Sequence, residues 1–353
     1  MPPAHSAFPA TDPKDIVSLR FTGRAGEYFR IWIVNVCLSV VTFGIYSAWA
    51  KVRRKRYFYG NTLLNDAAFE YLADPKDILK GRVIVLVIWM ALSLLQDKAI
   101  PGIAAILFLT VLPELVIRAS RFNAINSRHR GVRFRFGVGF KPKKNPQRSI
   151  PSAGYRETSQ FLILPVILVP LSLGLLYPYY AFRKRQFFLG HIAYGTTPFA
   201  FDARPGAFYF VYFKAALLFA VFLAGTAASL YLMSMIGGIA LLAVLPLYIV
   251  FAAYRDAAVG RLTYDHTTLG TLRFGCSWTP WGLFKLHLVN SLAIIFSAGL
   301  LLPWVSIRTA RYQLEGLSLR PSGELDAFVA AAQEEVSALG DEAGDLLGFD
   351  FGL

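Results

Sequence analysis

Cysteine is almost absent from this sequence, because Cys37 and Cys276 are the only two in 353 residues. Neither has a Cys or His partner at metal-ligand spacing, which argues against a disulfide framework and a zinc site, and both are interpreted as small apolar side chains. Phosphate-binding loops, dinucleotide fingerprints and nucleophile motifs are also missing. We therefore predict no catalytic residue, no metal, no cofactor and no enzymatic activity.

Charged residues are scarce as well. They make up 16% of the chain against 55% hydrophobic residues, and the mean hydropathy is +0.47, whereas a soluble globular protein has about 25% charged residues. The apolar residues gather in blocks at 82–96, 99–117, 161–182, 208–231 and 236–254. A helix needs about 20 mostly apolar residues to cross a bilayer. The blocks predict an all-α polytopic membrane protein, and the N-terminus lacks the pattern of a secretory signal peptide.

Acidic residues concentrate at the C-terminal end. The net charge of the chain is +14, yet residues 324–353 contain acidic residues and no Lys or Arg. The basic residues flank the apolar blocks and do not line one soluble face, which favours anionic phospholipid over nucleic acid as a partner. The lipid bilayer is thus the predicted partner, no nucleic acid is expected, and the oligomeric state stays open.

The sequence repeats internally. The stretch 44–71 aligns without a gap with 174–201, and a third, shorter copy follows near the C-terminal end. A glycine, an arginine and an asparagine recur at matched positions, which indicates one structural unit used more than once. The matched residues are Gly44, Gly174 and Gly299; Arg53, Arg183 and Arg308; and Asn35 with Asn290.

Short aromatic alternations accompany these copies, at 19–23, 69–75, 134–139, 199–205 and 272–278. Alternation bounded by Gly, Asp and Pro predicts short strands, which we expect to form a small cytoplasmic sheet beside the internal pseudo-repeats. The predicted organisation is a flexible N-terminus (1–16), a membrane domain (17–323) and an acidic amphipathic tail (324–353). Within the membrane domain, repeat units cover about 17–72, 131–203 and 270–320, and transmembrane hairpins cover about 82–118 and 207–254.

Lysine and arginine flank both ends of each repeat segment, whereas the tips of the two hairpins are almost uncharged. Short loops rich in Lys and Arg stay in the cytoplasm. This favours an arrangement in which three segments enter from the cytoplasmic side, break near the matched glycines and return. In the alternative, each segment crosses once and the chain makes seven crossings. The favoured arrangement is multi-pass, with the basic loops and the C-terminus in the cytoplasm.

The stretch FTGRAGEYFRIWIVNVCLSVVTFGIYSAWAKVRRKRYFYGNTLL resembles the opening signature of the YjgN family, bacterial inner-membrane proteins grouped under a domain of unknown function. The resemblance covers nearly the whole chain from about Val17, and PWVSIRTARY near the C-terminal end fits the same motif. Ala48 stands where the motif often has proline. The resemblance implies a location in the bacterial inner (cytoplasmic) membrane and brings no reaction, substrate or catalytic residue.

Two groups of side chains are candidate functional residues. Arginines at the ends of the repeat segments are suited to bind anionic lipid or a phosphorylated ligand, although topology signals with snorkelling side chains explain them without any ligand. Polar residues and helix breaks inside apolar segments are suited to line a solute path, although Asn also hydrogen-bonds between helices. The candidate lipid or anion contacts are Arg53, Arg56, Arg183, Arg308 and Arg311, and the candidate path or helix-break residues are Asn35, Gly44, Gly174, Asn290 and Gly299.

Two functions are consistent with these features. One is a small-solute transporter or channel built from repeated broken helices. The other is a non-catalytic membrane scaffold that binds anionic lipid or a protein partner through its basic cytoplasmic face. In the tail, Phe328, Val329 and Ala332 share one apolar helical face, and we expect this helix to dock on the basic cytoplasmic surface.

Overall fold

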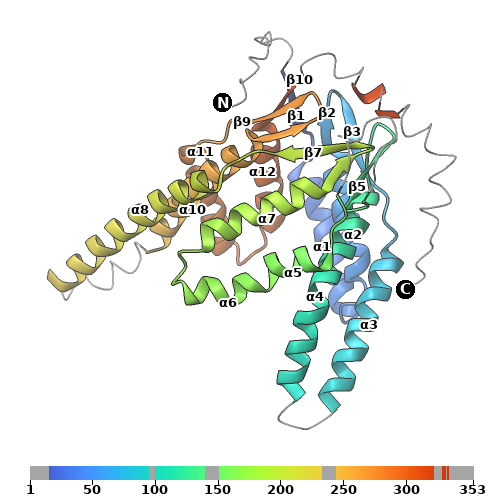
Figure 1. Cartoon of the computed structure of the whole chain (residues 1–353), viewed down its shortest axis with the longest axis horizontal. Coiled ribbons are helices and arrows are strands. Elements are labelled where there is room, and N and C mark those ends of the chain that lie inside the picture. The colour runs from blue at the N-terminus through green and yellow to red at the C-terminus, as the bar shows by residue number, and fades with distance from the viewer. Residues whose placement is uncertain are drawn as a thin grey trace, which may run out of the picture.

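The computed structural model describes residues 16–94, 100–139, 151–232, 244–321, 328–330 and 332–333. Strands gather at one end of the molecule and long helices extend from it (Figure 1). The strands are β1 (Val17–Phe21), β2 (Thr62–Leu64), β3 (Ala67–Tyr71), β4 (Ser127–His129), β5 (Val132–Phe136), β6 (Ile192–Tyr194), β7 (Thr197–Phe201), β8 (Thr267–Leu269), β9 (Leu272–Cys276) and β10 (Leu317–Pro321). The helices are α1 (Ala25–Val41), α2 (Ser47–Gly60), α3 (Pro75–Leu94), α4 (Ile100–Ile125), α5 (Tyr155–Leu162), α6 (Leu164–Leu171), α7 (Tyr177–His191), α8 (Pro205–Leu232), α10 (Val244–Tyr264), α11 (Pro280–Phe296) and α12 (Leu302–Glu315).

The strands of the described residues close into a barrel in the order β1-β10-β9-β8-β7-β6-β5-β4-β3-β2. Every neighbouring pair is antiparallel. Strand β1 pairs with β2 on one side and with β10 on the other, where Val17 lies opposite Leu319. The first and last strands therefore close the barrel, and the sheet keeps no free edge that could pair with another chain.

Each odd-numbered strand leads into helices that return to the next even-numbered strand. The helical connections in the described residues are α1–α2, α3–α4, α5–α6–α7, α8–α10 and α11–α12. Because antiparallel neighbours run in opposite directions, a connection between two of them starts and ends at the same end of the barrel. All these helical hairpins therefore extend from one end (Figure 1). The other end carries two-residue turns such as Asn65–Asp66, whose positive φ values of 48° and 56° fit a type I′ turn.

The barrel interior is apolar and layered. Alternate residues of a strand face the same side, and the middle residue of each odd-numbered strand packs in the core cluster. These residues are Leu19, Phe69, Phe134, Phe199 and Phe274. Each lies opposite an inward residue of the next even-numbered strand, namely Leu64, His129, Tyr194, Leu269 and Leu319. Ten short strands are thus held together by one continuous core.

The predicted all-α fold with a small sheet is wrong, because the sheet of the described residues is a closed ten-strand barrel whose strands alternate with the helical connections. Most even-numbered strands have three residues and follow a helix directly, so they are too short to show an alternating pattern. In the described residues, one helical segment, Pro205–Gly225, is long and apolar enough to cross a membrane, with a mean hydropathy of 2.0 and 12% of its residues buried. The expected hairpin tips at 96–100 and 230–238 lie mostly outside the described residues.

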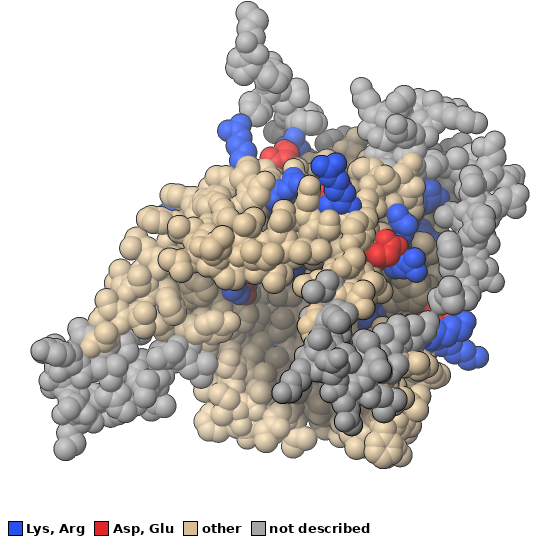
Figure 2. Space-filling model, turned by 60° about the horizontal axis from the view of Figure 1, so that its bottom comes forward, with Lys and Arg blue, Asp and Glu red and all other residues tan. Residues whose placement is uncertain are grey.

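Charge is distributed unevenly between the two ends of the molecule. The segments 31–50, 158–182, 215–254 and 286–307 contain no Asp, Glu, Lys or Arg. Their described parts belong to four of the helical connections and are distant along the chain from the strands. A view with the helical end turned forward shows a surface made mostly of uncharged residues, with Lys and Arg gathered nearer the barrel (Figure 2). At the hairpin turns, Phe43, Leu173 and Phe296 are 97%, 93% and 84% exposed.

Candidate functional site

Each helix that returns to the barrel is followed directly by an even-numbered strand, and hydrogen bonds fix several of these junctions. At three of these junctions, the hydroxyl of the first strand residue donates a hydrogen bond to the carbonyl oxygen four residues earlier. These residues are Thr62, Ser127 and Thr267, and the distances are 2.8, 2.7 and 2.7 Å. The bonds satisfy carbonyls at the end of each helix and fix the direction in which the chain enters the barrel. The ends of α2, α4 and α10 are thereby held directly beneath the strands.

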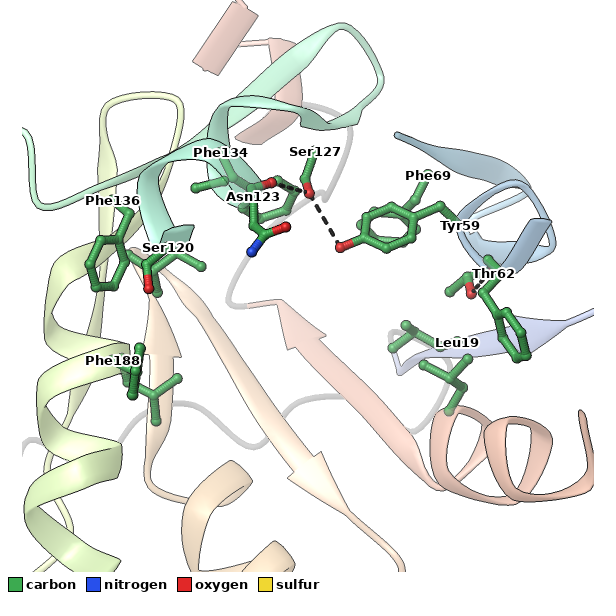
Figure 3. Close-up of a pocket in the computed structure, with 15 residues that line it drawn as sticks. Leu19, Tyr59, Thr62, Phe69, Ser120, Asn123, Ser127, Phe134, Phe136 and Phe188 are labelled. Carbon is green, nitrogen blue, oxygen red and sulfur yellow. Dashed lines mark hydrogen bonds between the residues drawn. The ribbon is translucent and has the colours of Figure 1, made fainter. Parts of the chain in front are cut away.

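A cavity of about 650 Å³ lies between the barrel and the ends of α2, α4, α7 and α12 (Figure 3). Its wall is almost entirely apolar and aromatic. The lining residues are Leu19, Phe58, Tyr59, Thr62, Phe69, Ser120, Asn123, Ala124, Ser127, Phe134, Phe136, Phe188, Leu189, Ile192 and Leu314. Leu19, Phe69 and Phe134 also line a second apolar cavity of about 220 Å³ in the barrel lumen. The two cavities therefore share a wall, and together they follow the inside of the barrel.

The larger cavity has one polar wall. The hydroxyl of Ser127 lies 3.2 Å from that of Tyr59, and the hydroxyl of Tyr71 donates to Asn123 Oδ1 at 3.3 Å. Lys55 Nζ donates to the same oxygen and lies 4.5 Å from the centre of the Tyr71 ring. Burial, with Tyr59 nearby, raises the pKa of Tyr71 to about 12, so its phenol stays neutral and remains a donor. An apolar cavity with a few convergent polar groups is typical of a binding site for a small molecule.

The far end of the lumen is closed by the C-terminal segment. Phe328 and Val329 line the smaller cavity, and Val329 and Ala332 are 5% and 3% exposed. The Phe328 ring stacks on Tyr194 with 6.3 Å between centroids, and Gln333 Nε2 donates to the carbonyl of Arg130. The tail residues that were expected to dock on a basic surface instead insert their apolar face into the barrel mouth.

The three glycines at the predicted breaks adopt one geometry. Gly44, Gly174 and Gly299 have φ values of +89°, +86° and +88° and are each preceded by another residue with positive φ. Each glycine N–H donates to the carbonyl oxygen five residues earlier, at 2.7, 2.8 and 2.9 Å. This is the Schellman arrangement that ends a helix. It places a chain reversal at each of these glycines, at the exposed turns of α1–α2, α6–α7 and α11–α12.

Sequence analysis missed a hydroxyl that recurs at these reversals. The side chains of Thr42, Ser172 and Ser297 accept hydrogen bonds from the backbone N–H four residues later, at 3.0, 3.1 and 3.0 Å. Each also donates to a carbonyl of the helix that ends there. One hydroxyl therefore caps both helices of the turn. The signal was a Ser or Thr two positions before each matched glycine.

The predicted path residues do not meet at the cavity. Asn290 Nδ2 donates to Thr309 Oγ1 at 3.0 Å, which joins α11 to α12 as an interhelical hydrogen bond. Asn35 is 7% exposed within α1, and its Oδ1 has no partner in the described structure. Neither residue lines either of the apolar cavities described above. Asn35 lies in the α1–α2 hairpin and Asn290 in the α11–α12 hairpin.

Two of the predicted anion contacts bind backbone carbonyls instead. Arginines at equivalent places on the returning helices donate to the loop after the neighbouring odd-numbered strand. The bonds in the described residues are Arg56 to Ala73 (3.0 Å), Arg121 to Gly137 (2.7 Å), Arg261 to Trp278, and Arg311 to Gly23 (2.9 Å). The bond from α12 to Gly23 joins the last helix to the first. These side chains tie adjacent hairpins into a ring, and Gln186 occupies the equivalent place on α7.

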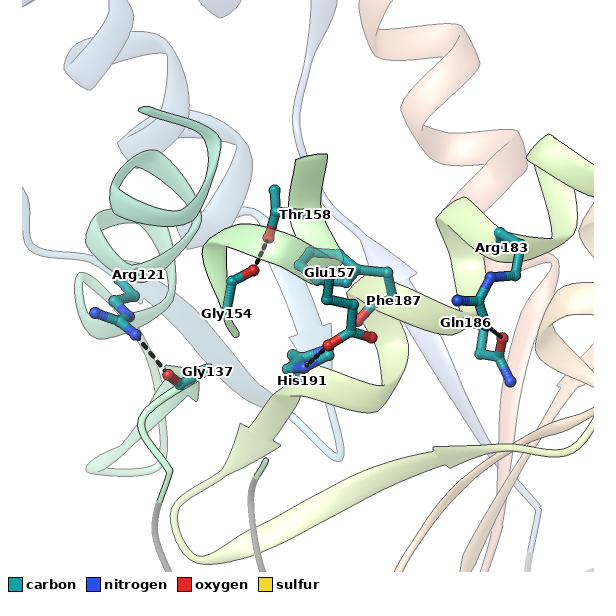
Figure 4. Close-up of polar contacts among 9 residues, drawn as sticks. All are labelled: Arg121, Gly137, Gly154, Glu157, Thr158, Arg183, Gln186, Phe187 and His191. Carbon is teal, nitrogen blue, oxygen red and sulfur yellow. Dashed lines mark hydrogen bonds and ion pairs between the residues drawn. The ribbon is translucent and has the colours of Figure 1, made fainter. Parts of the chain in front are cut away.

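The other predicted arginines lie apart from one another. Arg53 is exposed on α2. Arg183 donates to Gln186 Oε1 on its own helix at 2.7 Å, and the buried His191, which lies 3.4 Å from the exposed Glu157, is eight residues further along the helix (Figure 4). Arg308 lies over the Trp304 ring at 5.2 Å from its centre. The structure thus places the predicted arginines on separate hairpins and does not bring them together as one site.

Comparison with known proteins gives the family. Residues 17–346 match the family described as bacterial protein of unknown function (DUF898). The chain belongs to this family. It is also similar to the protein named inner membrane protein YjgN of Salmonella typhimurium strain LT2, with 33% identity over 122 residues, covering 34% of this chain and 31% of the relative. The YjgN resemblance found in the sequence is confirmed.

The relatives of the same name in Escherichia coli O157:H7 and strain K12 are 32% and 31% identical over 127 residues, covering 35% of this chain and 32% of each relative. The match thus spans about a third of the length of these curated relatives. Their name supports the predicted inner-membrane location. No solved structure matches the chain.

Proposed function

We propose that this protein is a multi-pass inner-membrane protein that binds an apolar molecule, such as a lipid acyl chain, in the cavity beneath its barrel. The observation that carries the proposal is the cavity of about 650 Å³ with an aromatic wall and a single polar side. Its volume and lining are in the range of known small-molecule sites. The polar wall of Tyr59, Asn123 and Ser127 would orient the polar end of such a molecule.

Insertion of the helical hairpins in the membrane is part of the proposal. Long charge-free segments at 31–50, 158–182, 215–254 and 286–307 support it, because burying charge in a bilayer is costly. The exposed apolar side chains at the turns, with Phe43 and Leu173 above 90%, support it further. In this arrangement the hairpins dip into or cross the bilayer, and the cavity lies where the ring of hairpins meets the barrel.

The barrel and its basic residues are proposed to face the cytoplasm, in line with the positive-inside rule. Exposed residues such as Arg53 and Arg54 then lie near the headgroups of the inner leaflet, where anionic phospholipid attracts them. The equivalent turns at Gly44, Gly174 and Gly299 support a common origin of the three predicted repeat units. Because every helical connection returns to the same end of the barrel, an arrangement with seven single crossings is disfavoured.

The lining of the cavity and lumen supports binding of an apolar molecule better than passage of a polar solute. The lumen is lined by Phe69, Phe134, Phe199 and Phe274, and Phe328 closes its far end. A polar solute would lose its hydration in this lumen and find few hydrogen-bond partners there. An acyl chain gains from the same surface, at about 25 cal/mol for each Å² of apolar area removed from water.

The proposal is tested by measuring bound lipid. The full-length protein, purified in a mild detergent from membranes, is expected to retain a lipid that organic extraction and mass spectrometry identify. The variant Leu189→Trp fills part of the cavity and should retain at least about threefold less of it, because the indole occupies the site. Leu171→Trp is the matched control, because Leu171 is 75% exposed near a hairpin turn and away from the cavity lining. Equal retention by both variants, with both folded, would contradict the proposal.

A further inference from the structure

A third cavity lies among α7, α8, α10 and α12, with a volume of about 240 Å³. Unlike the two apolar cavities, it is lined mainly by polar side chains, and we call it the polar cavity. Its lining includes the side chains of Arg185, Tyr212, Arg255, Tyr264 and Gln313. The neighbouring residue Leu314 lines the apolar cavity instead. Neighbouring residues of α12 thus line the polar cavity and the larger apolar cavity, which differ in chemistry, since arginines and phenols replace the phenylalanines.

Arg185 is the arginine of this cavity that makes no ion pair in the described residues, although Asp256 acts on it at longer range. It is half-buried, its Nη1 donates to the carbonyl of Ala181 at 2.9 Å, and its guanidinium lies 5.6 Å from the centre of the Phe208 ring. Neither contact supplies a negative charge. A desolvated guanidinium is stabilised when an anion shares its environment, because its hydration has been lost.

The carboxylate that lines the cavity, Asp256, already forms an ion pair. Arg255 Nε and Nη2 both lie 2.9 Å from Asp256 Oδ1, and His287 Nε2 lies 3.5 Å from Asp256 Oδ2. Arg255 and Asp256 therefore offset each other, and Arg185 leaves the cavity with a net positive charge. Asp256 also acts on Arg185, but one carboxylate faces two guanidinium groups, so an incoming anion would complete the charge balance.

Unused hydrogen-bond donors surround this charge. In the described structure, Tyr212 makes a ring contact with Tyr177, and Tyr264 makes one with Trp278, and neither phenol has a protein hydrogen bond. The backbone carbonyl of Gln313 accepts from Trp278 Nε1, and the side-chain amide of Gln313 makes no hydrogen bond in the described structure. Donors from three helices therefore line the same cavity as the guanidinium of Arg185.

We propose that this cavity binds a phosphate group, held by the guanidinium of Arg185 and the phenol hydroxyls of Tyr212 and Tyr264. Tetrahedral oxyanions accept several charge-assisted hydrogen bonds at once, and guanidinium groups match them in shape and charge. The phosphate belongs either to a soluble compound or to a phospholipid headgroup. The site is separate from the apolar cavity, and its occupation does not depend on a molecule bound there.

The experiment measures anion binding by the full-length protein in a non-ionic detergent. Thermal unfolding is followed with increasing inorganic phosphate, against sodium chloride at matched ionic strength, because a ligand that binds the folded state raises the midpoint. A second series uses short-chain phosphatidylglycerol against diacylglycerol of the same chains. Wild-type protein should be stabilised by phosphate, by phosphatidylglycerol, or by both, and Arg185→Gln should weaken that binding by about tenfold or more.

The matched control is Lys184→Gln, which removes an exposed positive charge from the neighbouring residue and should leave the affinity unchanged. Tyr264→Phe removes one hydroxyl and should weaken phosphate binding several-fold. If Arg185→Gln fails to fold, Tyr264→Phe serves as the test of the proposal. Stabilisation by inorganic phosphate alone assigns the site to soluble phosphate compounds, and stabilisation by phosphatidylglycerol alone assigns it to headgroups. No stabilisation by either probe, or equal stabilisation of wild type, Arg185→Gln and Tyr264→Phe, would overturn the proposal.

Discussion

At the scale of single residues, some arginines bind backbone carbonyls and another faces a cavity, and their positions in the sequence do not predict which. Arg56 and Arg311 were predicted to contact anions, but both donate to backbone carbonyls of the adjacent hairpin. Arg185 lies one residue before the place that Gln186 occupies in the same series, and it faces a polar cavity. Whether an arginine binds the protein or a ligand depends on which neighbour the fold brings to it.

The bonds between arginines and carbonyls should contribute to stability. Arg121 is half-buried, and its Nη2 donates to Gly137 O at 2.7 Å. Arg121→Met keeps the stem but loses the bond, and we expect the free energy of unfolding to fall by about 1–2 kcal/mol. Arg118→Met on the same helix breaks only the exposed pair with Glu114 (2.8 Å) and should cost less than about 1 kcal/mol. Denaturant unfolding in detergent measures both, and equal effects would contradict the prediction.

His129 should make stability depend on pH in the acid range. Burial in the barrel, with a smaller contribution from Arg130, lowers the pKa of His129 from its ordinary value of 6.5. As the pH falls through 6.5, the unfolded chain takes up a proton that the folded protein does not, so the free energy of unfolding decreases. The loss stops only below the folded pKa. Above about pH 7.5 this residue should have almost no effect on the pH dependence.

The measurement compares the thermal midpoint of wild type with that of His129→Phe between about pH 7.5 and pH 5.5. The phenyl ring keeps the stacking on Phe69, where the ring centroids are 4.4 Å apart, but does not titrate. Part of the acid destabilisation should disappear in the variant. Parallel pH profiles of the two proteins would show that His129 does not cause it.

At the scale of elements, the C-terminal segment shows how packing decided a contact that charge had suggested. Its apolar face was predicted from the spacing of Phe328, Val329 and Ala332. The acidic composition of the tail favoured a basic surface as its partner, whereas the described residues insert into the apolar barrel mouth. Burying apolar area stabilises more than exposed ion pairs do, which explains the outcome.

Removing this contact should open the lumen to water. In a variant without Cys37 and Cys276, a cysteine is introduced as Leu269→Cys, at a residue that is 5% exposed and lines the lumen. Phe328→Asp should raise its labelling rate by a water-soluble thiol reagent at least about tenfold, because a buried carboxylate is costly and releases the segment. Gln333→Ala, which loses only a bond to a backbone carbonyl, is the control and should change the rate little. An unchanged rate in Phe328→Asp would show that the segment does not seal the barrel.

At the scale of the whole molecule, the chain is a ring of helical hairpins closed by a barrel. Sequence comparison distinguished three repeat segments from two intervening apolar hairpins. In the described structure all five connections have the same relation to the barrel, because each links an odd-numbered strand to the next even-numbered one. The difference between the repeat segments and the apolar hairpins is therefore one of helix length and composition. The strand pairing is the same at all five connections.

The orientation of this ring is testable by cysteine labelling with an impermeant reagent. In the variant without native cysteines, Asn65→Cys at a barrel turn should be labelled in inverted vesicles and not in intact cells. Phe43→Cys, at an exposed apolar turn, should resist labelling in inverted vesicles because the bilayer covers it. Labelling of Asn65→Cys in intact cells would place the barrel outside and refute a cytoplasmic barrel.

The sequence by itself determined the local features of this protein. Apolar blocks, the glycine breaks, the odd-numbered strands and the family could all be read from short-range patterns, because helix ends and alternating strands depend on residues close together in the chain. Only the tertiary structure decided that the strands close into a barrel, that arginines tie neighbouring hairpins together, and that Tyr59, Asn123 and Phe188 meet around one cavity. These contacts join residues far apart in sequence. A strand of three residues is too short for its pattern to predict which strand it pairs with.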